Sequence, residues 1–167
     1  MSSLHRPGVL AAALLLALQS ACAPAAAPAP DLVAERSAVD SVLNALHQSA
    51  AEGDFARYFT LYAPDAVFLG TDATERWDLA AFRGYATGSA GWIYQMTERH
   101  TYVDADGNTA WFDERLRHAN YGEVRGTGVL VKGDSGWKIA QYNLSFPVPN
   151  ALADEFTQRI VAAEAAP

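Results

Sequence analysis

The residues that could carry chemistry are acids and a histidine in the second half of the chain. Glu98 and His100 stand two residues apart in one strand-like segment, and Asp113 and Glu114 lie in the next. Burial or a second carboxylate can raise the pKa of a pocket carboxyl toward that of a working general base. Glu114, Asp113 and His100 are therefore candidate catalytic residues for moving a proton beside a carbonyl group.

A second set of residues could bind a ligand rather than react with it. These candidates are Tyr62, Trp77, Glu98, Arg125, Gln141 and Asn143. Gln141 and Asn143 can orient a carbonyl or hydroxyl group, but an amide is neither acid nor base at neutral pH. Arg125 could bind a carboxylate-bearing ligand, or it could neutralise Glu114 in a buried pair, and the second arrangement is favoured. Tyr62 and Trp77 fit a hydrophobic core as well as a pocket mouth.

Strand alternation predicts which of these side chains share a wall, because successive side chains point to opposite faces. The predicted inner wall carries Glu98, His100, Glu114, Arg125, Gln141 and Asn143, and the predicted outer face carries Arg99, Trp111, Asp113, Arg115, Arg117 and Tyr142. The sorting assumes that the turn at 104–108 pairs His100 with Phe112 and that Lys132 and Lys138 point outward. A single β-bulge would invert part of it.

Three helices are expected to precede the strands. Apolar residues recur at helical spacing after Asp31, which can cap a first helix that Gly53 ends. Asp54 is expected to cap a short second helix that Pro64 stops, and a short strand follows at 66–69. Asp78 is expected to cap a third helix.

Four strands should follow, at about 92–103, 109–118, 124–132 and 137–146, separated by turn sequences rich in Gly, Asp and Asn. Asn150 can cap a last helix. This order predicts an α+β fold in which a cone-shaped, curved antiparallel sheet packs against three N-terminal helices, with a C-terminal helix and a pocket inside the cone.

The order of elements resembles the SnoaL-like group of the nuclear transport factor two-like superfamily, in a bacterial envelope subgroup. The resemblance rests on residues 53–77 (GDFARYFTLYAPDAVFLGTDATERW), 109–114 (TAWFDE) and 136–150 (GWKIAQYNLSFPVPN). It implies the cone fold, polar pocket residues at Gln141 and Asn143, and a homodimer through the outer sheet face at Trp111 and Tyr142. Members include polyketide cyclases, ketosteroid isomerases, dehydratases and non-catalytic modules, so the fold does not decide the function.

The N-terminus predicts export. Residues 1–21 have a weakly basic start and an apolar run too short to span a bilayer, and they end in small residues before Cys22. This resembles a bacterial lipoprotein signal with Cys22 as the lipidated first residue; an ordinary secretory signal is the alternative. Residues 22–30 form an Ala/Pro linker, 31–164 the folded domain and 165–167 a tail. The expected location is the cell envelope, lipid-anchored, or else periplasmic or secreted.

Composition narrows the partners. A chain of 167 residues with a formal net charge of −7 and no Lys/Arg cluster fits one domain and disfavours nucleic acid. His5, His47, His100 and His118 are not spaced as metal ligands, and no nucleotide- or flavin-binding motif occurs, so no metal or cofactor is predicted.

Three functions remain open. The favoured one is an envelope-located domain that binds a small molecule. The first alternative is a cofactor-free isomerase, cyclase or dehydratase that uses a pocket carboxylate as general base, with Tyr62, Asn143 or Gln141 at the oxyanion. The second alternative is a dimerising assembly module.

Overall fold

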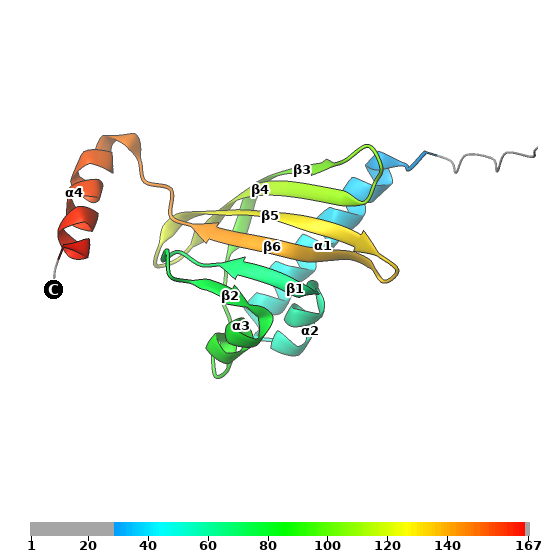
Figure 1. Cartoon of the computed structure of the whole chain (residues 1–167), viewed down its shortest axis with the longest axis horizontal. Helices are drawn as coiled ribbons and strands as arrows, with labels where there is room; N and C mark the ends of the chain where they lie inside the picture. The colour runs from blue at the N-terminus through cyan, green and yellow to red at the C-terminus, as the bar shows by residue number, and fades with distance from the viewer. Residues whose placement is uncertain (1–28, 166–167) are drawn as a thin grey trace, which may run out of the picture.

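The computed structural model describes residues 29–165, so the predicted signal, Cys22 and most of the predicted linker lie outside the described residues (Figure 1). Helix α1 spans Leu32–Glu52. The Asp31 side chain accepts hydrogen bonds from the backbone N–H of Val33 and Ala34, and Gly53 ends the helix with a left-handed φ of 67°. Both expected ends of α1 are confirmed.

The short elements after α1 differ in one boundary from the expectation. Helix α2 spans Phe55–Thr60 and is capped by Asp54, but it ends before Tyr62, which already begins strand β1 (Tyr62–Leu69). Pro64 therefore lies inside β1 instead of stopping a helix; pairing with the neighbouring strand is interrupted between Tyr62 and Val67, which tolerates its missing N–H. Strand β2 (Arg76–Asp78) leads into α3 (Leu79–Ala86), capped by Asp78 as expected.

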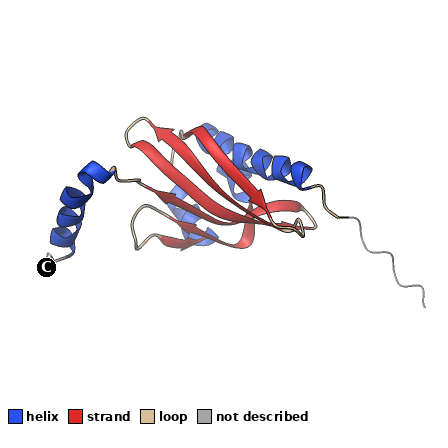
Figure 2. Ribbon diagram, turned by 90° about the horizontal axis from the view of Figure 1, so that it is seen from above, coloured by secondary structure: helices blue, strands red, loops and turns tan. Residues whose placement is uncertain are grey.

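The long strands are β3 (Gln95–Val103), β4 (Thr109–His118), β5 (Gly122–Gly133) and β6 (Gly136–Ser145). The sheet order is β2-β1-β6-β5-β4-β3. All neighbours are antiparallel except β1 and β6, which are parallel. Figure 2 shows this curved sheet with α1 lying along one face, so the α+β prediction is confirmed.

The core fills the space between α1 and the inner face of the sheet. Val39, Leu43 and Leu46 recur at helical spacing on α1 and are almost completely buried. They belong to one cluster that includes Ala110, Phe112, Leu130, Ile139 and a group of aromatic rings from α2, α3 and β1. Phe82 of α3 is at the centre of that aromatic group, stacked on Phe68 with ring centroids 4.0 Å apart.

The chain ends in the 3-10 turn η1 (Asn150–Leu152) and helix α4 (Ala153–Glu164). The Asn150 side chain makes no capping hydrogen bond at the start of η1 or α4, so the prediction that Asn150 caps the last helix is wrong. Within residues 29–165, no helix is both long and apolar enough to cross a membrane.

The register of β3 differs from the expectation by one residue. The hairpin closes where the N–H of Asp104 donates to the carbonyl of Thr109, which pairs Val103 with Ala110 and Arg99 with Glu114. A one-residue slip moves every side chain of the strand to the opposite face. Arg99 therefore points inward, and Glu98 and His100 do not lie on the inner wall.

Strand β5 is also turned over relative to the expectation. Val124, Gly126, Gly128 and Leu130 face inward, whereas Arg125, Thr127, Val129 and Val131 face outward. Lys132 misled the prediction, because its amine extends along the inner side to Glu35 of α1, at 2.5 Å. A long aliphatic side chain can line a buried face while its charge reaches an ion pair.

A bulge in β6 inverts the end of that strand. Gln141 pairs with Val129 but Ile139 pairs with Leu130, so Ala140 is the extra residue. Trp137 and Ile139 point inward as predicted. Beyond the bulge the inward side chains are Tyr142 and Leu144, and Gln141, Asn143 and Ser145 turn outward.

Candidate ligand-binding site

The carboxylate of Glu114 is fully buried at the inner face of β4 and hydrogen-bonded on both oxygens. His47 Nε2 lies 2.8 Å from Oε1, and the Tyr142 hydroxyl donates to the same oxygen at 2.8 Å. Arg99 Nε donates to Oε2 at 2.8 Å. Three separate elements, α1, β3 and β6, thus converge on one carboxylate.

Arg99 is itself held by helix α1. Its Nη1 donates to Asn44 Oδ1 at 2.8 Å and to the Asp40 carbonyl at 3.3 Å, and Asp40 Oδ1 accepts from Thr101 Oγ1 at 2.6 Å. Nη2 lies 2.8 Å from Glu114 Oε2, within ion-pair distance but outside hydrogen-bond alignment. Arg99 is therefore a fixed counter-charge that ties α1 to the sheet.

These contacts set the charge of Glu114. Burial raises the pKa of its carboxyl, but the hydrogen bond from His47 and the charges of His47 and Arg99 outweigh burial, and the net pKa is lowered. Glu114 is therefore ionised and is a poor proton acceptor. Burial and the neighbouring carboxylate raise the pKa of Tyr142 well above its usual range, so its hydroxyl keeps its proton and donates.

A cavity of about 190 Å³ opens beside this cluster. Its walls are mainly aromatic and come from the three N-terminal helices, strands β1, β2, β4 and β6, and the loops next to the strands. The lining residues are Tyr58, Phe68, Trp77, Phe82, Tyr85, Trp92, Tyr94, Tyr121, Tyr142 and Phe146, with His47, His118, Gly70, Thr71, Glu75, Leu46, Ala50 and Leu144. Tyr58 and Tyr142 are buried at its inner end, whereas Tyr85 and Tyr121 are exposed at its mouth.

His47 lines the cavity and also contacts the acid cluster. A carboxylate can only accept, so Nε2 carries the proton of the hydrogen bond to Glu114, and whenever the ring is neutral its lone pair is therefore on Nδ1. Nδ1 has no hydrogen-bond partner among residues 29–165, and the side chain, 13% exposed, lines the cavity. An ionised acid behind an imidazole fixes the orientation and tautomer of the ring, which suits it to accept a proton or a hydrogen bond.

Tyr58 supplies a hydrogen-bond donor to the same cavity. Its hydroxyl lies 2.9 Å from that of Tyr62. Either hydroxyl could be the donor of this hydrogen bond; donation by Tyr62, which lies behind the cavity wall with no other side-chain partner among the described residues, satisfies Tyr62 without a ligand. Burial raises the pKa of Tyr58, and the hydrogen bond accepted from Tyr62 partly opposes that rise. The proton of Tyr58 is thereby left for a group inside the cavity.

Comparison with known proteins identifies the family. The model of the SnoaL-like domain matches residues 39–149, which include His47, Tyr58, Arg99, Glu114 and Tyr142. The chain belongs to the SnoaL-like family. No curated protein matches it.

Solved structures give the fold of this SnoaL-like domain independently. An NTF2-like protein of unknown function from Pseudomonas putida KT2440 is 15% identical, with a TM-score of 0.60 over 71% of this chain and 90% of that one. A proposed dehydratase of the NTF2-like family from Streptomyces avermitilis is 15% identical, with a TM-score of 0.58 over 70% and 99%. An NTF2-like protein with a cystatin-like fold from Novosphingobium aromaticivorans is 15% identical, with a TM-score of 0.58 over 74% and 88%. At these identities the similarity shows the fold alone.

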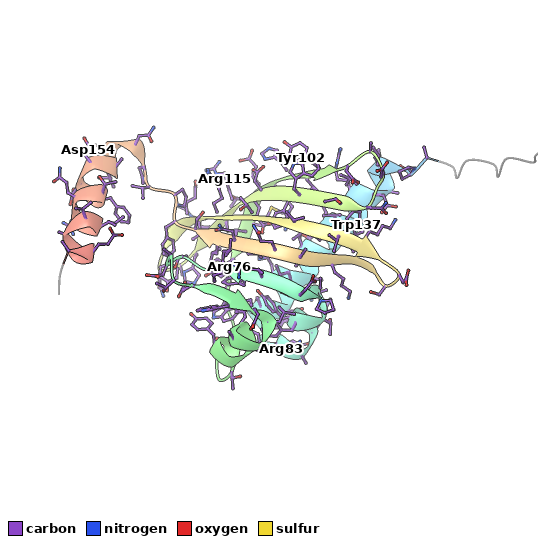
Figure 3. All side chains as sticks on the ribbon, viewed as in Figure 1. Arg76, Arg83, Tyr102, Arg115, Trp137 and Asp154 are labelled. Atoms are coloured by element: carbon purple, nitrogen blue, oxygen red, sulfur yellow. The ribbon has the colours of Figure 1, made fainter. Side chains whose placement is uncertain are left out.

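The SnoaL-like domain places several candidate residues away from the cavity. His100 Nδ1 lies 3.1 Å from Asp113 Oδ2, and His100 Nε2 lies 3.6 Å from Glu98 Oε1, with all three side chains about half exposed. They stand on the outer face, where Figure 3 shows Tyr102 and Arg115 projecting away from α3. The inner-wall positions expected for Glu98 and His100 are wrong because of the slip in β3, whereas Asp113 is on the expected face.

The remaining candidates divide between the wall and the outer face. Trp77 lines the cavity, and Tyr62 lies one layer behind it. Arg125, Gln141 and Asn143 face outward, so the expected pair of Glu114 with Arg125 is wrong, and Arg99 takes that place. Tyr142, expected on the outer face, is inside.

His47 was not among the predicted site residues. It lies on α1, 67 residues before Glu114 in the chain. The available signal was its position beside Leu46 on the apolar stripe that continues through Leu43 and Ala50. A histidine at that place must face the core and needs a buried partner.

Gly126 makes room for the acid cluster, which gives a test of its packing. A Cβ at this position would overlap the Tyr142 hydroxyl and lie 2.9 Å from Glu114 Oε1. Gly126→Ala should therefore lower the free energy of unfolding by about 1–3 kcal/mol, as overpacking does. Urea denaturation measures this, with Gly133→Ala as control, because nothing lies within 4 Å of a Cβ there. Equal stability of the two variants would contradict the packing described.

Proposed function

We propose that this SnoaL-like domain binds a small, flat, mainly apolar molecule in the aromatic cavity, and that the polar end of the molecule meets His47 and Tyr58. The observation that carries the proposal is a cavity of about 190 Å³ whose aromatic walls end at two unused polar atoms. Drug-sized ligands occupy roughly 300–1,000 Å³. The cavity therefore suits a compound of one or two rings.

The polar atoms restrict the functional group that such a molecule would carry. Tyr58 offers a proton and the Nδ1 atom of His47 offers a lone pair, which together fit a hydroxyl or carbonyl group. None of the described residues that line the cavity is Lys or Arg. The ligand that we propose is therefore neutral and carries an oxygen atom, whereas the sequence alone suggests a carboxylate bound to Arg125.

Titration with 2-naphthol tests the proposal, because this fluorescent two-ring alcohol has the size and polarity that the cavity suits. We expect saturable binding. Tyr58→Phe should weaken it about fivefold to tenfold, the value of one hydrogen bond near 1–1.5 kcal/mol. Tyr62→Phe is the matched control, because it leaves the Tyr58 hydroxyl in the cavity. No saturable binding by the wild type, or equal loss in both variants, would contradict this site.

A second candidate function is proton transfer, and the pairing of His47 with Glu114 specifically favours it. With an enolisable ketone in the cavity, His47 Nδ1 would accept the proton from the carbon next to the carbonyl, and Glu114 would stabilise the imidazolium that forms. Tyr58 would donate a hydrogen bond to the enolate oxygen. His47, rather than Glu114, Asp113 or His100, is then the general base of an isomerase or dehydratase.

We further propose that binding takes place in the cell envelope, with the domain tethered through a lipid on Cys22. Only the sequence of residues 1–30 supports this location. Dimerisation through the outer sheet face likewise stays a prediction. It now relies on Trp111 and Tyr102, which are stacked 5.7 Å apart and about half exposed.

A further inference from the structure

Helix α4 has an apolar side that packs against no other described part of the protein. Leu152 at the end of η1 and Phe156 and Ile160 of α4 recur every four residues and are 52%, 45% and 42% exposed. Of the described residues of α4, none is buried. Figures 1 and 2 both show α4 apart from the sheet and from α1, α2 and α3. A helix of this length is marginal alone in water, so a surface that covers its apolar stripe is needed.

The connection from β6 to α4 starts at the mouth of the cavity. Phe146, the first residue after β6, lines the cavity and packs on Tyr121, with ring centroids 5.2 Å apart. Residues 147–149 can span roughly 10 Å when extended. Pro147 and Pro149 fix two of the φ angles in this connection, so a change in the direction of α4 has to come from the remaining backbone angles of residues 146–149.

The mouth itself has aromatic side chains without cover. Tyr85, Tyr121 and Phe146 line the cavity and are 60%, 56% and 42% exposed. A helix is about 10–12 Å wide, and twelve residues span about 18 Å, which is enough to cover the opening of a cavity this small. On the outer face of the sheet, by contrast, the surface next to Ser145 carries the charged Arg125. The exposed aromatic side chains at the mouth, where the connection to α4 starts, are therefore apolar partners that the stripe could cover.

We propose that α4 is a hinged lid that closes over the cavity and lays Leu152, Phe156 and Ile160 on Tyr85, Tyr121 and Phe146. The role of the lid rests on the proposed function, because closure would hold a ligand inside the cavity. Closure would also exclude water from His47 and Tyr58, which strengthens their interactions with a polar ligand group.

A disulfide between the lid and the rim tests closure without a ligand. The full chain with Cys22→Ser carries Tyr121→Cys and Phe156→Cys, and the control carries Tyr121→Cys and Gln158→Cys. Two cysteines bridge only when their Cβ atoms come within about 3.5–4.5 Å. We expect an intrachain disulfide in the first variant, formed at least about tenfold faster than in the control, as measured by mass spectrometry after mild oxidation. No bridge, or a bridge between two chains only, would overturn the lid and assign α4 to another surface.

Release of 2-naphthol tests the consequence of closure. Phe156→Asp with Ile160→Asp removes the apolar stripe, and Thr157→Asp with Gln158→Asp adds the same charge on other sides of the helix. The first pair should raise the dissociation rate about tenfold, and the second should leave it within about twofold. Equal rates would overturn the lid. If the intrachain disulfide forms but the wild type does not bind 2-naphthol, the proposed ligand class is wrong and the lid stands. If the wild type binds 2-naphthol but the disulfide does not form, the lid is wrong and the proposed ligand class stands.

Discussion

Arg99→Met is expected to lower the free energy of unfolding by about 3–5 kcal/mol, because it leaves the buried carboxylate of Glu114 without its permanent counter-charge. His47 and Tyr142 still contact Oε1, but Oε2 loses the Arg99 Nε hydrogen bond. The tie between Asn44 of α1 and the sheet is lost as well. Urea denaturation followed by circular dichroism measures the change.

Two further variants separate a buried charge from a general effect of losing arginine. Arg115→Met removes an arginine from the half-exposed ion pairs with Glu98 and Glu123, and a much smaller change is expected. Adding Glu114→Gln to Arg99→Met should recover part of the lost stability, because the neutral amide leaves no buried charge while its oxygen can still accept from His47 and Tyr142. If Arg99→Met is as mild as Arg115→Met, or if the double variant is less stable than Arg99→Met, the role given to Arg99 is wrong.

His47→Gln is expected to slow the exchange of the α-protons of 2-tetralone with D₂O by about 10²–10⁴-fold, the usual contribution of a positioned general base. The ketone has the two-ring size that suits the cavity, and its enolate oxygen would lie at Tyr58. Glutamine can still donate to Glu114 but cannot take up a proton at neutral pH. Proton NMR of the ketone follows the exchange directly.

His100→Gln is the matched control for this experiment. His100 also lies next to a carboxylate, Asp113, but on the outer face and away from the cavity. We expect its exchange rate to equal that of the wild type. A wild-type rate no faster than that in buffer would rule out proton transfer on this ketone and leave the binding function, whereas equal losses in both variants would refute the assignment of the base.

Local signals in the sequence predict most of the fold. Asp31, Asp54 and Asp78 cap helices as expected, because an aspartate before an apolar helical pattern satisfies the first backbone N–H groups. The face of β4 is also correct, since Ala110, Phe112 and Leu116 form the more apolar of its two faces and bring Glu114 inside.

The candidate site was harder to predict because it depends on pairing between strands. In the hairpin around residues 104–108, Ala110 pairs with Val103 and not, as the turn sequence suggests, with Tyr102. As a result, Arg99 lies on the inner wall in place of His100. The bulge at Ala140 likewise puts Tyr142 on the inner wall in place of Gln141. Both shifts depend on how a strand pairs with its neighbour and cannot be read from one strand alone, so the sequence finds Glu114 but assigns it the wrong arginine.

The central claim is that the cavity receives a small aromatic alcohol or ketone with its oxygen at the inner end. A crystal structure of the protein with 2-naphthol, at a concentration that saturates binding in solution, tests it most directly. We predict the naphthol rings against the cavity walls at Trp77 and Trp92, with the oxygen within about 3.2 Å of the Tyr58 hydroxyl or of His47 Nδ1. An empty cavity, or naphthol bound on Trp111 at the outer face, would contradict the account.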